Sequence, residues 1–103
     1  MEYEMILTTV ASEDEARAMA RSLVEARLAA CVQIQPIRSV YRWKDKVLEE
    51  PEWRLVVKTV AERYVAVERH IREQHSYETP QIIRVRIEGG SADYLKWVEE
   101  SVG

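Results

Sequence analysis

The 103-residue sequence has only one cysteine, Cys31, together with three glycines and three prolines. A single cysteine excludes a disulfide within the chain and any CxxC metal or redox pair, which suits a reducing compartment. No apolar run is long enough to cross a bilayer, so we expect no membrane partner. The N-terminus carries acids where a signal peptide carries basic residues, and we therefore expect the protein to be cytoplasmic.

A cationic surface is also missing. The chain has 15 lysines and arginines against 18 aspartates and glutamates, for a formal net charge of -3. Because nucleic acids are bound through basic faces that neutralise their phosphates, we expect no nucleic-acid partner. No repeat, linker or low-complexity segment is present, and the length suffices for one hydrophobic core but not for two. The sequence therefore predicts a single domain over residues 1–103.

Hydrophobic periodicity predicts four strands and three helices. Apolar residues spaced by three and four mark the helices, whereas compact apolar runs or a spacing of two mark the strands. The expected elements are a buried central strand at 4–11, a helix from Ser12 to near Arg27, strands at 29–43 and 47–60 joined by a turn at 44–46, a helix at 61–74, a strand opening at Pro80 and ended by Gly89-Gly90, and a short terminal helix capped at 91–93. This order is that of a ferredoxin-like split βαβ, an α+β fold whose antiparallel sheet has its helices on one face.

Four local patterns refine this expectation. Ser12 and Glu15 match the reciprocal capping box of a helix start. The apolar pattern changes parity after Pro36, which predicts a β-bulge on an edge strand. Strict alternation over 83–88 predicts a last strand with one buried and one polar face. The acidic stretch 49–52 lacks the ligand count of a calcium loop, so we expect it to be solvated and to keep an edge from pairing.

The two consecutive strands within 29–60 are too long for one subunit. A strand of about fourteen residues spans about 46 Å, whereas a chain of this size folds to a diameter of about 33 Å. Part of the hairpin must therefore project, and an isolated apolar ribbon is only marginally stable in water. A symmetric oligomer in which each hairpin packs on a neighbouring copy would cover it. We expect three aromatic residues to fill this interface rather than to form a ligand-stacking platform: Tyr41, Trp43 and Trp53.

Several separated segments resemble the CutA divalent-cation-tolerance family. They are residues 29–34, 39–44, 53–59 and 75–80, which read AACVQI, SVYRWK, WRLVVKT and HSYETP. The likeness extends from about residue 6 to residue 97, with the motifs in the order of the family. It implies a homotrimer of ferredoxin-like subunits, a role in tolerance of copper and other divalent metals, and an architecture similar to that of PII signalling proteins.

Two positions depart from the family pattern. Asp45 stands where the hairpin turn of the family has glycine, which leaves the ribbon possible but favours a different turn type. Ser76 replaces the proline of the family's His-Pro-Tyr-Glu motif, and we expect this change to loosen the approach to Tyr77 and the placement of His75.

Three residues are candidate metal ligands: Cys31, His75 and Glu78. A soft thiolate, an imidazole and a hard carboxylate would suit copper or another divalent ion if they converged. Other roles remain open, because a lone strand cysteine is often a small buried apolar residue, His75 can complement a helix C-terminus, and Glu78 can accept hydrogen bonds in a turn. By parity Cys31 faces the open side of the sheet or a subunit boundary. The pattern does not decide whether His70 is buried or solvated.

These observations favour a homotrimer that binds metal ions without catalysis and without an organic cofactor. The alternative is a small-molecule sensor or scaffold resembling PII proteins, with its ligand between subunits. Two classes that share the fold do not match: acylphosphatases need an anion cradle after the first strand, where residues 9–15 are acidic, and RNA-recognition domains need a basic, aromatic signature that residues 53–58 lack. We therefore expect no enzymatic activity.

Overall fold

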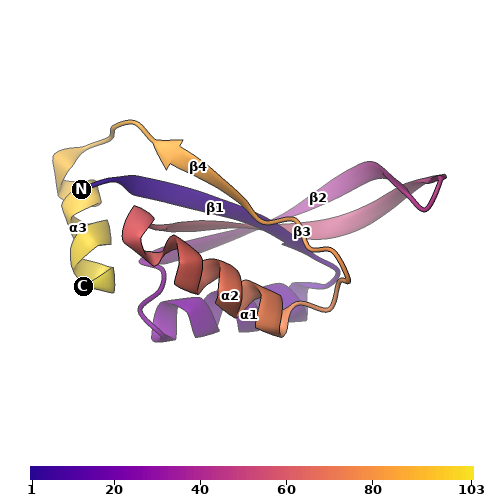
Figure 1. Ribbon diagram of the computed structural model, residues 1–103, viewed down its shortest axis with the longest axis horizontal. Helices are drawn as coiled ribbons and strands as arrows, with labels where there is room; N and C mark the ends of the chain where they lie inside the picture. The colour runs from indigo at the N-terminus through magenta and orange to yellow at the C-terminus, as the bar shows by residue number, and fades with distance from the viewer.

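A computed structural model describes all residues from 1 to 103 and has the predicted α+β, ferredoxin-like architecture (Figure 1). Four antiparallel strands lie in the order β2-β3-β1-β4, so that β1 is central, as its apolar run predicts. The elements are β1 (Tyr3–Val10), α1 (Glu13–Glu25), β2 (Cys31–Trp43), β3 (Lys46–Val60), the 3-10 turn η1 (Ala61–Arg63), α2 (Tyr64–Gln74), β4 (Ile83–Ile87) and α3 (Ala92–Val102).

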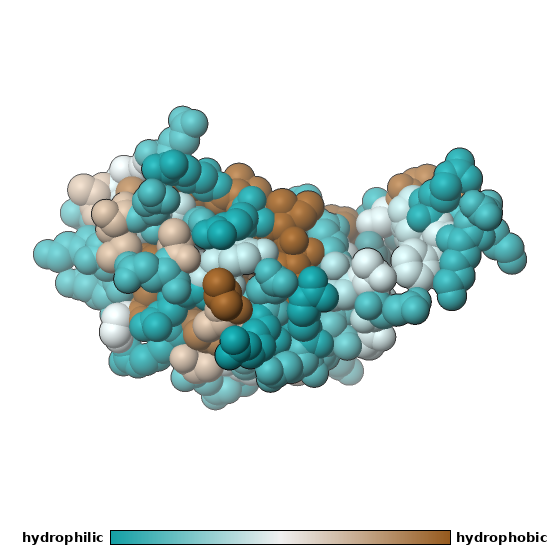
Figure 2. Space-filling view, in the orientation of Figure 1, coloured by the Kyte–Doolittle hydropathy of each residue, from teal (hydrophilic) through white to brown (hydrophobic).

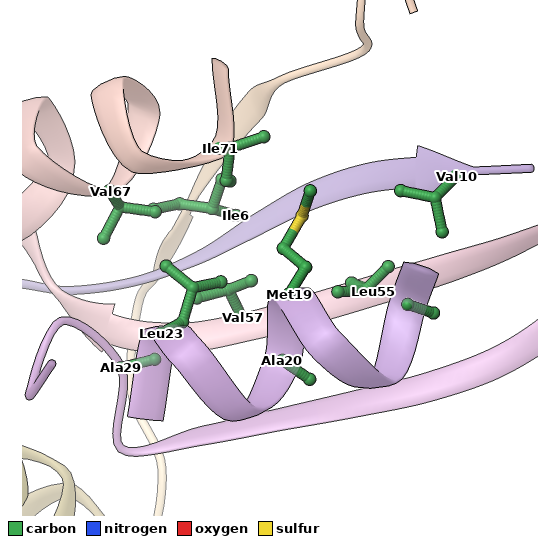
Figure 3. Packing of buried hydrophobic residues seen from close by; sticks show 11 residues of the cluster. Ile6, Val10, Met19, Ala20, Leu23, Ala29, Leu55, Val57, Val67 and Ile71 are labelled. Carbon is green, nitrogen blue, oxygen red and sulfur yellow. The ribbon is translucent and has the colours of Figure 1, made fainter. Parts of the chain in front are cut away.

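The core lies between the sheet and the two helices α1 and α2, which cover one of its faces (Figure 3). The apolar stripe of α1 is buried against alternate residues of β1 and β3, with Met19 and Leu23 at most 1% exposed. α2 adds Val67 and Ile71, and both are fully buried. Alternate residues of the strands and helix residues spaced by three and four thus pack together in one apolar layer.

The start of α1 confirms half of the predicted capping box. The Ser12 hydroxyl accepts a hydrogen bond from the backbone N–H of Glu15 at 3.1 Å. The Glu15 carboxylate does not reach back to Ser12 but accepts hydrogen bonds from Ser76, in the loop between α2 and β4. The reciprocal box is therefore wrong, because a distant loop supplies better donors for this carboxylate.

The hairpin of β2 and β3 pairs without interruption from Cys31 opposite Lys58 to Trp43 opposite Lys46. The predicted bulge at Pro36 is wrong, since Pro36 lies directly opposite Trp53 in an unbroken register. The apolar pattern changes face there for another reason: the first part of β2 packs against the core through Val32 and Ile34, whereas its last part belongs to the ribbon that projects from the domain (Figure 1). Two residues, Lys44 and Asp45, make the turn, both with positive φ, as a type I′ hairpin requires.

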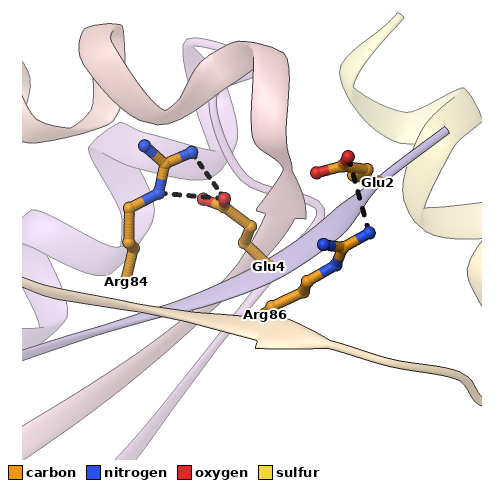
Figure 4. A network of polar contacts seen from close by, with 4 residues as sticks. All are labelled: Glu2, Glu4, Arg84 and Arg86. Carbon is orange, nitrogen blue, oxygen red and sulfur yellow. Dashed lines mark hydrogen bonds and ion pairs between the residues drawn. The ribbon is translucent and has the colours of Figure 1, made fainter.

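The apolar residues of β4 face away from the helices, contrary to the prediction of a buried face. Ile83 is 48% exposed and lies opposite Leu7, on the sheet face that α1 and α2 leave open. The other face of β4 carries Arg84, whose guanidinium binds the buried carboxylate of Glu4 (Figure 4). The same guanidinium lies 4.1 Å from the ring centre of Tyr64. Alternation defined the two faces of this strand but not which one meets the helices.

The third helix packs across the end of the sheet that lies away from the hairpin. Val98 and Val102 of α3 form a small cluster with Val60 and the half-buried Tyr3. The helix is eleven residues long, and no helix of the structure combines the length and apolarity needed to cross a membrane. The open face keeps a group of apolar side chains that are only partly covered: Met5, Leu7, Val56, Ile83, Val85 and Ile87.

The hairpin projects from the body, as strand length predicts. The molecule measures 44 × 25 × 22 Å, and its long axis runs along the ribbon (Figure 1). Apolar side chains on the projecting part are exposed, with Val40 and Val47 at 65% and Tyr41 and Trp43 at 38%. Figure 2 shows apolar and weakly polar surface continuing from the body onto this ribbon. An isolated copy therefore leaves a substantial apolar area in water.

Candidate functional site

A cavity of about 680 Å³ lies where the hairpin leaves the sheet. One side of it comes from the ends of β1 and β2 and from Glu52 in the middle of β3, and the other side is the loop between α2 and β4. The lining residues are Thr9, Ser39, Val40, Tyr41, Trp43, Glu52, Ser76, Tyr77, Glu78, Thr79 and Gln81. Aromatic rings and acidic groups therefore share one cavity, whose volume is typical of small-molecule sites.

His75 ties the α2–β4 loop to the end of β1. It is the C-cap residue of α2, and its Nε2 lies 2.8 Å from the carbonyl oxygen of Thr9. Because a carbonyl only accepts, Nε2 carries the proton and donates, and Nδ1 accepts the backbone N–H of Tyr77 at 3.1 Å. Both ring nitrogens of His75 are therefore engaged within the chain.

Ser76 fastens the same loop to α1, so the expectation that it loosens the loop is wrong. Its backbone N–H donates to Glu15 Oε2 at 3.2 Å, and its hydroxyl lies within 3.1 Å of both carboxylate oxygens. Proline has neither donor, so the serine provides an anchor that the family motif lacks. The loop is thus held by β1 through His75 and by α1 through Ser76.

Tyr77 closes the loop over Glu52 of β3. The Tyr77 hydroxyl donates to Glu52 Oε2 at 2.6 Å, and the Glu52 residue is only 8% exposed. The expectation of a solvated acidic stretch is therefore wrong for Glu52, although Glu49 is 60% exposed beside Arg38. Glu50 accepts a hydrogen bond from the Tyr41 hydroxyl. Sequence reasoning missed Glu52 as a site residue; the available signal was its parity with Arg54 and Lys58, which places it on the open face.

Burial and the neighbouring Glu52 carboxylate raise the pKa of Tyr77 well above its ordinary value of 10.0. Above pH 10 an unfolded tyrosine loses its proton while folded Tyr77 keeps it, so this group stabilises the fold fully below pH 10 and progressively less above it. The free energy of unfolding is therefore expected to fall as the pH rises above 10, with a slope that solvent screening reduces. Denaturant titrations from pH 8 to pH 11.5 measure the slope.

The comparison uses the Tyr77→Phe variant. Tyr77→Phe is expected to have a shallower alkaline slope than the parent chain, because it lacks the hydroxyl that titrates. Equal slopes for the two proteins would contradict the role given to the Tyr77–Glu52 contact.

The three predicted metal ligands do not form a site within one chain. Cys31 begins β2 opposite Lys58, on the open face of the sheet, whereas Glu78 lines the cavity and His75 lies behind it. No group of three or more histidine, cysteine, aspartate or glutamate side chains is placed to hold a metal ion. His75 would also have to give up one of its two hydrogen bonds to bind a metal. His70, which the sequence left open, lies half-buried between α1 and α2, with Nε2 2.8 Å from the Ser22 hydroxyl.

Comparison with known proteins identifies the family. A family model described as the CutA1 divalent ion tolerance protein matches residues 4–101. The chain belongs to the CutA1 family. The Thermus thermophilus protein named divalent-cation tolerance protein CutA is 42% identical over 101 residues, covering 97% of this chain and 98% of that one. The solved structure of the periplasmic divalent cation tolerance protein CutA from Archaeoglobus fulgidus matches with a TM-score of 0.96 at 38% identity, covering 98% and 99% of the two chains.

CutA1 proteins are named for more than one compartment. The Archaeoglobus fulgidus structure is described as periplasmic. An Arabidopsis thaliana relative, named protein CutA, chloroplastic, is 37% identical over 94% of this chain and 54% of its own length. The cytoplasmic location expected from the sequence therefore stays a prediction.

Proposed function

We propose that this chain acts in the cytoplasm as a homotrimeric CutA1 protein that binds divalent metal ions, copper foremost, and contributes to metal tolerance without catalysing a reaction. The observation that carries the proposal is the family membership, since relatives along the whole chain are named for divalent-cation tolerance. Cell fractionation with an antibody to the chain tests the location.

The projecting hairpin supports the oligomer. Its exposed apolar side chains and the partly covered open face of the sheet are two surfaces that one copy cannot bury by itself. Cys31 lies on that open face, so packing of copies against it would bring the thiol to a subunit boundary. Metal ligands of different subunits would then meet where a single chain has no complete set.

Metal binding is tested by calorimetric titration of the assembled protein with copper and with zinc. Cys31→Ser and His75→Ala are each expected to weaken binding at least tenfold if the thiol and the imidazole ligate the ion. His70→Gln is the matched control, since it removes a histidine that lies between α1 and α2, away from the cavity residues. Parent-like binding by both Cys31→Ser and His75→Ala would refute this ligand set.

A second candidate function is that of a small-molecule sensor or scaffold resembling PII proteins. The cavity of about 680 Å³ favours it, because such a volume matches an organic molecule better than a single ion. Native mass spectrometry of the purified protein tests this candidate, and a retained small molecule is the expected result. Absence of any bound molecule across a metabolite panel would count against it.

A further inference from the structure

The loop between α2 and β4, residues 75–82, is held closed by polar contacts of its first three residues. These contacts join His75 to Thr9, Ser76 to Glu15 and Tyr77 to Glu52. No part of the loop belongs to a helix or strand, and none of its residues is buried. Segments held by a few hydrogen bonds near solvent, with little buried apolar area, open at a low cost in free energy. The loop is therefore expected to open while the rest of the chain stays folded.

The closed loop occupies both ring nitrogens of His75. Nε2 carries the proton and donates to the Thr9 carbonyl at 2.8 Å, and the lone pair of Nδ1 accepts the backbone N–H of Tyr77 at 3.1 Å. An imidazole binds a metal ion or attacks an electrophile only through a free lone pair. The closed form offers none, so the chemistry of this ring requires that the Tyr77 amide move away.

Glu15 restrains the position of that amide. The Tyr77 N–H belongs to the peptide bond that follows Ser76, and Ser76 gives both its backbone N–H and its hydroxyl to the Glu15 carboxylate. Glu15 takes part in none of the ion pairs of the structure, so Ser76 is its partner in the fold. Hydrogen bonds to a carboxylate are stronger than those to a neutral acceptor, and this contact therefore favours the closed loop.

We infer that the α2–β4 loop is a conformational device that masks the imidazole of His75, and that Glu15, acting through Ser76, sets the fraction of molecules in which the loop is closed. A ligand of His75 then binds only the open form, and its apparent affinity is lowered in proportion to the open fraction. The inference goes beyond the proposed metal binding, because it concerns any reagent that uses this lone pair. Glu15 is a positioning residue and touches no ligand itself.

Acylation by diethyl pyrocarbonate tests the masking without a metal ion. The reagent reacts with an imidazole through a free lone pair. Peptide mass spectrometry of the treated, assembled protein gives separate rates for His75 and His70, the two histidines of the chain. The ratio of the two rates removes any change in global stability, because unfolding of the whole chain would expose both rings.

Three variants locate the restraint. Glu15→Ala removes the acceptor of both Ser76 hydrogen bonds and is expected to raise the ratio of the His75 rate to the His70 rate about fivefold. Ser76→Ala removes only the hydroxyl and is expected to raise this ratio about twofold. Glu13→Ala is the matched control, because Glu13 lies in the same turn of α1 and is exposed, and it is expected to give the parent ratio.

Calorimetric titration of the assembled protein with zinc connects the loop to the proposed metal binding. Glu15→Ala is expected to bind zinc about fivefold more tightly than the parent chain, because less of the binding free energy is spent on opening. A parent-like His75 rate in both Glu15→Ala and Ser76→Ala would overturn the inference, whatever the zinc affinity. A faster His75 rate with unchanged or weaker zinc binding would support the masking and refute His75 as a zinc ligand.

Discussion

Replacing Tyr41 and Trp43 together with serine is expected to dissociate the proposed trimer at micromolar concentration. The two rings lie on one face of the projecting ribbon and are 38% exposed in a single copy. Buried aromatic anchors at protein interfaces are worth about 2 kcal/mol or more each, so losing two costs about 4 kcal/mol per interface, on the order of a thousandfold in the association constant. Sedimentation equilibrium between about 1 and 100 μM gives the mass of the assembly and its dependence on concentration.

The matched control is Val65→Ser, on α2. Val65 is 68% exposed and lies away from the hairpin, so its loss is expected to leave the assembled mass unchanged. The parent chain is expected to sediment with three times the 12.0 kDa of one copy. A well-folded parent that sediments as a single chain, or a double variant that assembles like the parent, would contradict the oligomer proposed from the hairpin.

Replacing Arg84 with methionine is expected to destabilise the fold more than the loss of an exposed ion pair does, because the buried Glu4 carboxylate loses its cationic partner. The Glu4 side chain is 8% exposed; its Oε2 accepts hydrogen bonds from Arg84 Nε at 2.9 Å and from Nη2 at 2.5 Å, and Oε1 is buried without a partner. Arg84 itself is 47% exposed, so solvent screening keeps the effect below that of a fully buried pair. Equilibrium denaturation at one fixed protein concentration measures the change.

A neighbouring ion pair provides the control for this prediction (Figure 4). Arg86 Nη2 lies 3.5 Å from Glu2 Oε2, but both side chains are more than half exposed. Arg86→Met is therefore expected to change stability by less than about 0.5 kcal/mol. The double variant Glu4→Gln/Arg84→Met is expected to recover most of the loss, because neither charge is then left without its partner. Equal effects of Arg84→Met and Arg86→Met would refute the role of burial.

The predicted elements agree with the structure because their signals are local. The Ser12 hydroxyl acts on an amide three residues away, and the apolar stripe of α1 repeats within each turn. The length of the hairpin follows from strand geometry, which is why its projection could also be predicted. The faces of β4 could not be assigned in this way. Alternation is the same whichever face is buried, and the partner that draws Arg84 to the helix side is Glu4, eighty residues earlier.

The candidate site was predicted only in part. The family motif directed attention to His75 and Glu78, and both lie at or beside the cavity. The sequence predicts that Glu52 is solvated, because the acidic stretch 49–52 lacks the ligand count of a calcium loop. Its burial depends on Tyr77, which follows twenty-five residues later and reaches β3 only because the loop is tied to β1 and α1.

The sequence by itself therefore determines the local order of this protein. It predicts the periods of strand and helix, the cap at Ser12 and the length of the ribbon, because each depends on residues that are close in the chain. Only the tertiary structure decides the candidate site. The site forms from contacts between residues 25 to 66 positions apart, which join Tyr77 to Glu52, Ser76 to Glu15 and His75 to Thr9. Such contacts depend on where each element packs, and no pattern of short range specifies that.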